Sequence, residues 1–396
     1  MRKKFLSALL LCCMVLTLLP TAALADGDVA INEANFPDSG FRGYVKEKFD
    51  KNKDDVLSAD EIADVKSISV AGKSITSVKG IEHFTALESL FVGSPITTLD
   101  VSKNTELTSI DCNHTKLTTL DTSHNKKLVS LSCSEIPTLT SLNVSGSTAL
   151  KVLYCSADAL TDLDLTNNLE LEKLDCGGNE FTTLDLSNNK KLKDFGYYGN
   201  KLSSLDLTNN TELEKISFLG GNLSTIDVSK NTKLKILRLI DTTLTTLDVS
   251  KNKNLQTLEW LRNSLTSMKL GDSGSTMEVK FDNKPYPIEV STATGTFDLS
   301  KLSGFDVDKA SDWKNGIVND NILTVNEGVE NVTYTYDCGE RQATYGTPAV
   351  TEKLMMPCTL KINWKNADGP AAPVLELRTK TPTDIKVTEN NEWEYS

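Results

Sequence analysis

The residues best suited to chemistry lie between positions 50 and 61, where oxygen-bearing side chains follow one another at short intervals. If the first aspartate counts as position 1, side-chain oxygens fall at positions 1, 3, 5 and 12, and the carbonyl of residue 56 falls at position 7. Oxygen ligands at this spacing are what a hard cation such as Ca²⁺ requires. The sequence therefore predicts a calcium-binding loop with these ligands: Asp50, Asn52, Asp54, Val56 and Glu61.

The same stretch also carries the signals of a capped helix. Position 6 of the loop holds Asp55, although the turn needs a positive φ there and glycine is the usual residue. Ser58 and Glu61 have the spacing of a capping box. The stretch resembles an EF-hand or dockerin-type loop, and three apolar residues four apart predict a helix before it: Phe41, Val45 and Phe49. Calcium binding and an acidic turn that caps the next helix both stay open as interpretations.

Four cysteines recur at intervals of 21 or 22 residues: Cys112, Cys133, Cys155 and Cys176. Disulfides between neighbours would need an awkward geometry, because side chains on adjacent parallel strands lie side by side. A zinc ion needs ligands that converge tetrahedrally, whereas these would form a line. Apolar residues occupy the same position in other copies of the pattern, so we predict a ladder of buried free thiols.

The histidines give no sign of catalysis. The chain contains three, His83, His114 and His124, and none lies near a serine or cysteine nucleophile motif. We interpret them as solvated residues of turns, and we predict that the protein is not an enzyme.

These candidates belong to a repeat that organises most of the chain. An apolar residue opens each unit, and successive units are 21 residues apart with one interval of 22: Ile75, Ile96, Leu117, Leu139, Leu160, Phe181, Leu202, Leu223, Leu244 and Leu265. A fixed period of this size indicates a solenoid, in which equivalent residues of successive units stack on one another.

The repeat resembles the leucine-rich-repeat family. The segment from Leu107 to Leu117 fits the pattern L-x-x-L-x-L-x-x-N-x-L, with Cys112 at the third apolar site and Thr115 at the asparagine site. The 21-residue period and the cysteine column together resemble internalins of the internalin J type, and the opening segment resembles the helical cap that precedes internalin repeats. The resemblance implies a surface-exposed role in binding or adhesion.

The chain divides into five segments. Residues 1–25 are predicted to be a signal peptide, with a basic start, an apolar core too short to span a bilayer and a small-residue cleavage site at Ala23-Leu24-Ala25. The others are a helical cap with the EF-hand-like loop (26–66), about ten repeats (67–284), a β-rich domain (285–366) and the incomplete start of a further β-module (367–396). The predicted fold class is α+β/β solenoid: a right-handed leucine-rich-repeat solenoid with a helical N-cap, followed by an antiparallel β-sandwich-like domain.

The charge limits the partners. The chain has 42 Lys and Arg against 54 Asp and Glu, a net charge of −12. Such a protein repels polyanions, which excludes nucleic acid and an anionic membrane surface as expected partners. We predict a monomer without membrane insertion, secreted or extracellular, with cell-wall association as an alternative. Its expected partner is a protein of a host or of the cell envelope, and a glycan is the alternative.

Each repeat contains two candidate strands. One half carries an almost invariant aspartate column, and we predict that each carboxylate bonds its own turn, because like charges stacked on adjacent strands repel one another. A ladder bridged by calcium is the alternative. The other half varies in its outward positions, as a recognition surface can, and we assign it to the concave sheet.

One outward column of that half becomes apolar in successive units, at Tyr198, Leu219, Ile240 and Leu261, with Ile236 and Arg238 beside them. A contiguous apolar stripe on a solvent-facing sheet usually marks an interaction site. We predict that these six residues bind a partner. The alternative is that they turn inward or are covered by the following domain.

The last third alternates short apolar runs with turn residues, which predicts an antiparallel β-domain that covers the end of the solenoid. A disulfide between Cys338 and Cys358 is the favoured interpretation of its two cysteines. Trp313 and Trp364 are candidates for glycan contacts, with core packing as the favoured alternative. A structural spacer of the cell envelope and a glycan-binding surface module are the alternative functions.

Overall fold

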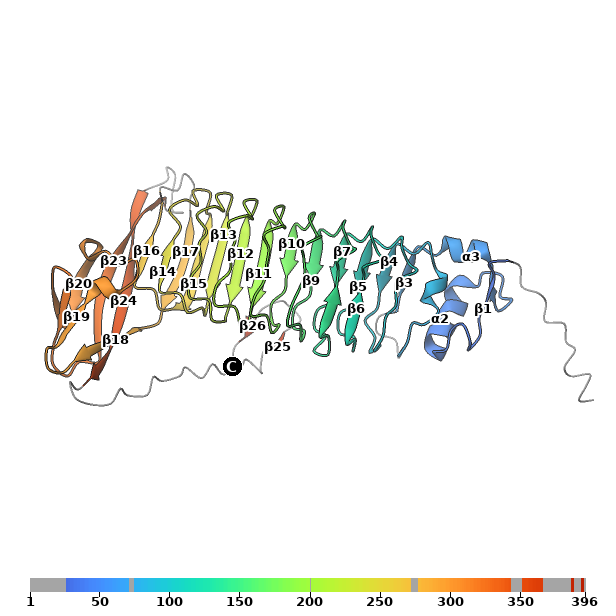
Figure 1. Cartoon of the computed structure of the whole chain (residues 1–396), viewed down its shortest axis with the longest axis horizontal. Helices are drawn as coiled ribbons and strands as arrows, with labels where there is room; N and C mark the ends of the chain where they lie inside the picture. Colours follow the sequence, from blue (N-terminus) through green and yellow to red (C-terminus); the bar gives the residue numbers. More distant parts are fainter. Residues whose placement is uncertain are drawn as a thin grey trace, which may run out of the picture.

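The computed structural model describes residues 26–70, 75–199, 201–271, 277–342 and 351–365, with two short strands beyond, β25 (Lys386–Val387) and β26 (Trp393–Glu394). The repeats stack into an elongated rod, with the helical segment at one end and a β-domain at the other (Figure 1). The predicted signal peptide and most of the predicted module over 367–396 lie outside the described residues. In the described part of the chain, no helix is long and apolar enough to cross a membrane.

The first end of the rod is a small helical cap. It contains α2 (Ser39–Phe49) and α3 (Ala59–Asp64), and the strands β1 (Val29–Ala30) and β2 (Val56–Leu57) pair antiparallel beside them. Asp38 caps α2 by accepting a hydrogen bond from the backbone N–H of Phe41 at 2.8 Å. Phe41 and Val45 are fully buried and Phe49 is half-buried, so the helix predicted from their spacing is confirmed.

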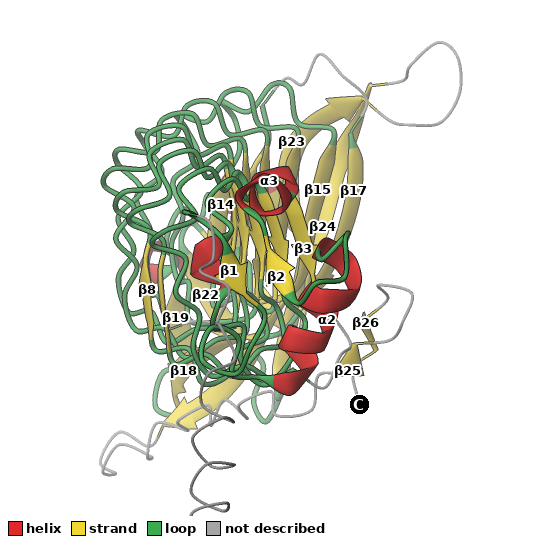
Figure 2. Ribbon diagram, turned by 90° about the vertical axis from the view of Figure 1, so that its right-hand side faces the viewer, coloured by secondary structure: helices red, strands yellow, loops and turns green. Residues whose placement is uncertain are grey.

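One wall of the rod is a single parallel sheet of eleven strands, which we call the long sheet. Its strands are, in sequence order, β3 (Ser67–Ser69), β4 (Ser89–Phe91), β5 (Ser109–Asp111), β7 (Ser130–Ser132), β9 (Val152–Tyr154), β10 (Lys173–Asp175), β11 (Asp194–Tyr198), β12 (Lys215–Leu219), β13 (Ile236–Ile240), β15 (Thr257–Asn263) and β17 (Glu278–Asn283). Viewed along the rod, these strands line one side, and turns fill the other (Figure 2). The long sheet is the one that the sequence analysis assigned to the variable half of the repeat.

The stacking is in register, as the repeat requires. Leu174 pairs with Phe195, Phe195 with Ile216 and Ile216 with Leu237, and all four are fully buried. An in-register column of apolar side chains gives a continuous core along the rod. The leucine-rich-repeat solenoid is therefore the observed fold.

The wall opposite the long sheet is made of turns and short strands. Among the described residues of this wall, two strand pairs form: β6 (Thr119–Asp121) with β8 (Ser141–Asn143), and β14 (Thr246–Asp248) with β16 (Ser267–Lys269). A short 3-10 helix, η1 (Ile81–His83), lies in the first repeat. Buried asparagines tie the coils together, because each donates through Nδ2 to two carbonyls of the preceding coil at 2.8–3.2 Å: Asn104, Asn125, Asn168, Asn189, Asn210, Asn231 and Asn252.

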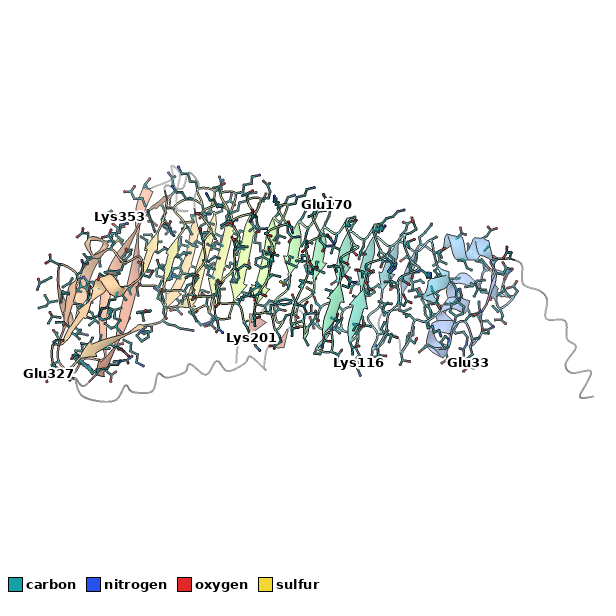
Figure 3. The ribbon with its side chains drawn as sticks, in the orientation of Figure 1. Glu33, Lys116, Glu170, Lys201, Glu327 and Lys353 are labelled. Atoms are coloured by element: carbon teal, nitrogen blue, oxygen red, sulfur yellow. The ribbon has the colours of Figure 1, made fainter. Side chains whose placement is uncertain are left out.

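The surface of the rod carries ion pairs that repeat with the coils. Lys127 pairs with Glu106, Lys191 with Glu170 and Lys233 with Glu212, each at 2.6 Å and each across one coil. Figure 3 labels Glu170 on the edge of the rod where these pairs lie. Exposed pairs of this kind contribute about 0–1 kcal/mol each, so we interpret them as surface stabilisation and not as a site.

The described residues of the C-terminal β-domain form two small sheets. The first has the order β18-β24-β23-β20 and the second the order β19-β22-β21. Their elements are β18 (Tyr286–Ser291), β19 (Thr296–Asp298), η2 (Leu299–Lys301), η3 (Val307–Lys309), β20 (Ala310–Lys314), β21 (Gly316–Asn319), β22 (Ile322–Val325), β23 (Asn331–Gln342) and β24 (Thr351–Lys365). Pairing is antiparallel apart from β18 with β24, which is parallel. The β18–β24 pair therefore departs from the purely antiparallel domain that the sequence predicted.

The β-domain covers the end of the solenoid, as predicted. Tyr334 donates from its hydroxyl to the carbonyl of Thr266 at 2.9 Å, and the N–H of Leu270 donates to the carbonyl of Cys338 at 2.8 Å. Stacked turns expose apolar side chains at their open end, and this domain buries them.

The favoured disulfide between Cys338 and Cys358 is wrong. Both thiols are free and buried. Cys358 pairs with Tyr334 across β23 and β24, so Cys338 lies four residues farther along its strand. That offset is roughly 13 Å, well beyond the reach of a disulfide.

Candidate functional site

The predicted apolar stripe forms one unbroken row on the long sheet. Tyr198 pairs with Leu219, Leu219 with Ile240, and Ile240 with Leu261, so the four side chains stack directly across β11, β12, β13 and β15. Neighbouring strands lie about 4.8 Å apart, which makes the row about 14 Å long. All four side chains are half-buried.

Strand alternation decides which way these residues point. In β12 and β13 the fully buried residues alternate with half-buried ones, and Leu219 and Ile240 fall in the half-buried set. Ile236 and Arg238 lie on the same outward face as Ile240, because the three occupy alternate positions of β13. The structure therefore brings all six predicted partner-binding residues to one face. Whether they bind a partner stays a prediction.

The Tyr198 ring lies across the preceding coil. A Cβ built on Gly177 would come within 2.0 Å of Tyr198 Cδ1, and one built on Gly178 within 3.0 Å of Cε2. The hydroxyl of Tyr198 hydrogen-bonds the side chain of Ser156, two coils back. Burial, and then the charge of Asp175, raise the pKa of Tyr198 to about 12, so the phenol is neutral at physiological pH.

A strip without side chains runs beside the aromatic end of the stripe. The residue after the stripe position has a positive φ in every coil of this region, and in three successive coils it is glycine: Gly178, Gly199 and Gly220. A Cβ added at Gly199 or Gly220 would meet no atom closer than 3.8 Å. The glycines therefore leave open room next to Tyr198 and Leu219.

The two ends of the stripe differ in charge. At the Leu261 end, Glu259 binds Arg238 at 2.9 Å and Lys280 at 3.3 Å, so its charge is compensated. At the Tyr198 end, Asp175 accepts hydrogen bonds from Ser156 Oγ at 2.6 Å and from the N–H of Gly177 at 3.4 Å.

A buried aspartate lies close to the Tyr198 end. Asp158 is 7% exposed, its Oδ1 accepts from the N–H of Ile136 at 2.8 Å, and its Oδ2 has no hydrogen-bond partner. Burial raises the pKa of Asp158 to about 7. The sequence analysis missed this residue. The repeat could have pointed to it, because Asp158 occupies a column that holds polar but uncharged residues in other coils: Thr115, Asn179 and Asn263.

The predicted calcium loop folds as a helix–loop–helix segment between α2 and α3. Asp55 adopts the positive φ that its loop position requires, at 64°. Asp50 is almost fully buried and accepts from the N–H groups of Asp54 and Asp55 at 3.2 and 3.1 Å. Asp54 in turn accepts from the N–H of Val56 at 2.9 Å and from the side chain of Asn52 at 2.9 Å. The carboxylates thus fix the loop backbone.

Glu61 is engaged in the predicted capping box. Its Oε2 accepts from the N–H and hydroxyl of Ser58, both at 2.9 Å, while its Oε1 accepts from the N–H of Lys51 at 2.7 Å. Burial alone would raise the pKa of Glu61, but these hydrogen bonds bring it below the usual value. Within the described residues, no group of three or more His, Cys, Asp or Glu side chains is arranged to hold a metal ion. Asn52 and the carbonyl of Val56 lie outside these residue types, so calcium binding at the loop stays a prediction.

The cysteine column is a buried ladder of free thiols, which confirms the prediction. All four thiols are fully buried: Cys112, Cys133, Cys155 and Cys176. Burial raises the pKa of each of them, so none is a thiolate at neutral pH.

The aspartate column also behaves as predicted. In each coil the carboxylate, or the amide at position 143, accepts from the N–H two residues on at 2.8–3.1 Å: Asp100, Asp121, Asn143, Asp164, Asp185, Asp206, Asp227 and Asp248. Hydrogen bonds from that same residue lower the pKa of Asp185 and Asp206. Each aspartate therefore stabilises its own turn.

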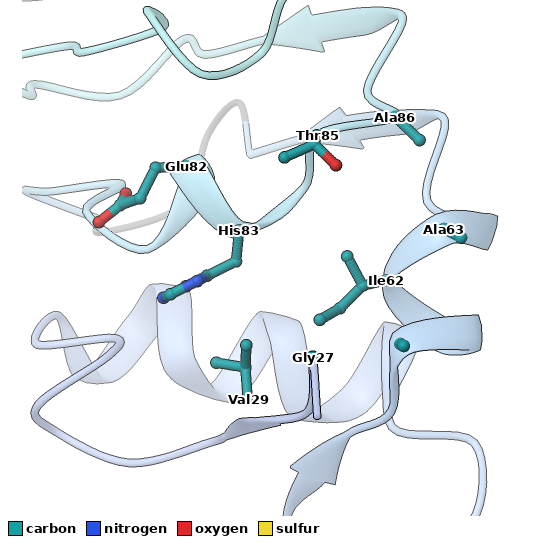
Figure 4. Close-up of a pocket in the computed structure, with 9 residues that line it drawn as sticks. Gly27, Val29, Ile62, Ala63, Glu82, His83, Thr85 and Ala86 are labelled. Carbon is teal, nitrogen blue, oxygen red and sulfur yellow. The ribbon is translucent and has the colours of Figure 1, made fainter. Parts of the chain in front are cut away.

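The remaining candidates lie apart from the stripe. His83 borders a shallow pocket between the cap and the first repeat, with Val29 and Ile62 (Figure 4). His114 and His124 are exposed turn residues, as expected. Trp313 stacks on Tyr334 with ring centroids 4.6 Å apart, and Trp364 donates to the carbonyl of Val329 at 3.0 Å. Both tryptophans are partly buried against the core, as the favoured interpretation held.

Comparison with known proteins gives structural neighbours only. No protein-family model matches the sequence, and no curated protein matches it. The functional domain of InlJ from Listeria monocytogenes, which includes a cysteine ladder, is 21% identical, with 85% of this chain and 99% of that chain covered and a TM-score of 0.31. Internalin C2 from the same species is 21% identical, with 59% of this chain and 97% of that chain covered and a TM-score of 0.45. A leucine-rich-repeat protein of Leptospira interrogans is 19% identical, with 57% of this chain and 69% of that chain covered and a TM-score of 0.46. These three neighbours are leucine-rich-repeat proteins, and the likeness concerns the fold alone.

Proposed function

We propose that this leucine-rich-repeat solenoid is a non-enzymatic recognition or adhesion protein, secreted or held at the cell surface. It binds a protein of a host or of the cell envelope through the outward face of the long sheet. The stripe of Tyr198, Leu219, Ile240 and Leu261 is the centre of that contact. Export rests on the predicted signal peptide, and exclusion of nucleic acid rests on the net charge of −12.

One observation carries this proposal. The stripe column holds Asn113, Ser134 and Ser156 in earlier coils, whereas four later coils place apolar side chains there in an unbroken row. These side chains are half-buried by their neighbours, so a partner would remove the remaining apolar surface from water. Most of each side chain is already buried, so covering the rest contributes about 0.5 kcal/mol per residue and roughly 2 kcal/mol for the row.

The chemistry of the chain fits binding better than catalysis. The four ladder thiols are buried and protonated, and buried protonated thiols are inert as nucleophiles. Calcium, if bound at the cap loop, would rigidify the first end of the solenoid and not take part in a reaction.

The test compares two double variants that place two acidic residues on directly paired strands. Leu219→Asp with Ile240→Asp puts them in the stripe, and Ser109→Asp with Ser130→Asp puts them on the same outward face of β5 and β7. Both variants are checked for the native fold by circular dichroism. Partners are identified by incubating wild-type protein with host or envelope extracts, and affinity for the purified partner is then measured.

We expect the stripe variant to lose at least tenfold in affinity and the control to stay within twofold. Equal affinity of the stripe variant and wild type would refute the proposed contact. A wild-type protein that retains nothing from either extract would favour a structural spacer.

A further inference from the structure

Three ionisable side chains lie on the turns that follow the long sheet in three successive coils. His114 and Glu135 hold the same repeat position, each with a positive φ, and His114 Nδ1 lies 3.1 Å from Glu135 Oε2. Asp158 follows in the next coil, one residue past the equivalent position. The turns of residues 134–137 and 156–159, which we call the turn pair, are therefore adjacent in the stack.

Hydrogen bonds join the two turns. The N–H of Ile136 donates to Asp158 Oδ1 at 2.8 Å. The N–H of Glu135 donates to the carbonyl of Ser156 at 2.7 Å, and the N–H of Ser156 donates to Ser134 Oγ at 3.0 Å. Each coil of a solenoid contacts only its neighbours, so such bonds can open locally without unfolding the rod. Of the three bonds, the one to Asp158 depends on a titratable group.

The repeat position of Asp158 suits an amide better than a carboxylate. In later coils it holds Asn179 and Asn263, which accept through Oδ1 from an N–H of the preceding coil at 3.1 and 2.9 Å. Both also donate through Nδ2 to a carbonyl of the preceding coil at 2.7 Å. Asp158 reproduces the first bond, but its Oδ2 takes the place of Nδ2 and has no partner. A proton on Oδ2 restores the donor that the position requires.

Among the described residues, the groups that face Asp158 offer it no compensating charge. The phenol of Tyr198 is neutral, and Glu135 in the preceding coil carries a like charge. Three ladder thiols also lie within electrostatic reach, and burial raises the pKa of each, so they are neutral as well: Cys112, Cys133 and Cys155. An ionised carboxylate that is buried without a partner is unfavourable, and it gains free energy when water reaches it.

The sign of the pH effect follows from the shift at Asp158. Burial raises the pKa of Asp158 to about 7 from 3.8, and the charge of Glu135 adds to the rise. Stability that comes from the protonated acid is therefore present below about pH 4 and is lost as the pH rises through 7. The His114–Glu135 pair acts in the same direction, because it is ionic only while the imidazole is protonated. Both of its side chains are more than half exposed, so solvent screens the pair and Asp158 dominates.

We propose that the turn pair is a proton-sensitive contact between two coils of the solenoid, closed in acidic medium and opened progressively as the pH rises through neutral. In the closed state the proton on Asp158 supplies the missing donor. Its loss leaves a buried charge that is better solvated when the two turns separate.

Opening of the turn pair also reaches the stripe. Ser156 belongs to the second turn, and it binds both the hydroxyl of Tyr198 and the carboxylate of Asp175. Separation of the turns therefore removes a support of the aromatic end of the stripe. This effect on recognition rests on the proposed function, whereas the opening itself does not.

Amide hydrogen exchange followed by mass spectrometry tests the proposal on the purified protein. Exchange is compared at pD 5.0 and pD 8.0, with the times scaled for the intrinsic exchange rates. The protection of residues 134–139 should fall about tenfold at pD 8.0, because local opening exposes these amides. The turn of residues 240–244, where Asn263 accepts from the N–H of Thr242, is the internal control and should change less than twofold.

Three variants, each checked for the native fold by circular dichroism, assign the effect. Asp158→Asn keeps the acceptor for Ile136 and supplies a donor at every pH, so residues 134–139 should be equally protected at both pD values. Asn179→Asp is the reciprocal variant and should transfer the pH dependence to the turn of Leu160, whose N–H it accepts. Asp162→Asn removes an exposed carboxylate nearby and should behave as wild type.

Equal protection of residues 134–139 at both pD values in the wild type would overturn the proposal. So would a pH dependence that persists in Asp158→Asn, or a loss of protection that is as large in the control turn, since that indicates global destabilisation. Should Asp158→Asn not fold, a turn at Leu160 that stays insensitive to pH in Asn179→Asp would overturn it instead. None of these outcomes involves a partner, so they leave the proposed contact of the stripe standing.

Discussion

Replacing Asp158 by asparagine should stabilise the protein at neutral and alkaline pH. Asp158 is buried, and its Oδ2 has no partner. One coil later, Asn179 occupies the same column and donates through Nδ2 to the carbonyl of Cys155 at 2.7 Å and to that of Cys176 at 3.1 Å. An asparagine at position 158 can donate in the same way, whereas a carboxylate cannot. A protonated Asp158 can also donate one hydrogen bond, which the ionised form cannot. This agrees with the raised pKa of Asp158.

The sign of the pH dependence follows from the two protonation equilibria. The pKa of Asp158 is raised to about 7 in the folded protein, from 3.8 for an unperturbed aspartate. The stability that comes from the protonated acid is therefore fully present below about pH 4 and is lost as the pH rises through 7. The difference corresponds to about 4 kcal/mol at most. Relaxation of the protein and water around the ionised carboxylate reduces the loss of stability, so we expect it to be about 2 kcal/mol.

The assay is urea unfolding followed by circular dichroism from pH 4.5 to 8.5, for wild type and Asp158→Asn. The free energies of unfolding should differ little at pH 4.5 and by about 2 kcal/mol at pH 8.5, with the variant more stable. Asn179→Asp serves as the reciprocal variant and should acquire a similar loss of stability with rising pH. Parallel curves for wild type and Asp158→Asn across this range would refute the reasoning.

Two further predictions concern the thiols and the cap loop. The six cysteines in the described residues are free and buried. A thiol reagent such as dithionitrobenzoate should therefore label none of them in the native protein and all six in denaturant. Rapid labelling of the native protein would contradict the burial of the ladder. At the cap loop, Glu61→Ala removes the capping box and should lower stability by about 1 kcal/mol without calcium, as measured by urea unfolding. Calorimetric titration of the wild type with CaCl₂ tests the loop directly: binding that Asp50→Asn abolishes supports the predicted site, and no heat at millimolar calcium rules it out.

The repeat made much of the fold predictable from sequence. In a solenoid, residues one period apart become neighbours, so a column in the sequence is already a contact in space. This is why the buried cysteine ladder and the outward row of Leu219 and Ile240 were predictable. The bond from each aspartate to its own turn was predictable for a different reason: it spans two residues and depends only on local geometry.

The tertiary structure decided what periodicity does not encode. Cys338 and Cys358 lie in a domain without repeats, and their separation depends on the register of two long strands, which no local pattern specifies. At the cap loop, the sequence supported both a calcium ligand and a helix cap for Glu61, and in the structure its oxygens bind backbone N–H groups of Lys51 and Ser58.

The candidate site depends partly on the sequence pattern and partly on the tertiary structure. Its position and its apolar row follow from the sequence alone, because the period places Tyr198, Leu219, Ile240 and Leu261 in one column. The orientation of the Tyr198 ring follows only from the structure, since it depends on the absence of a side chain at Gly177 in the neighbouring coil. The same is true of the unpartnered oxygen of Asp158. A repeat fixes which residues are adjacent, but the direction of each side chain and the protonation of a buried acid are set by packing and desolvation in three dimensions.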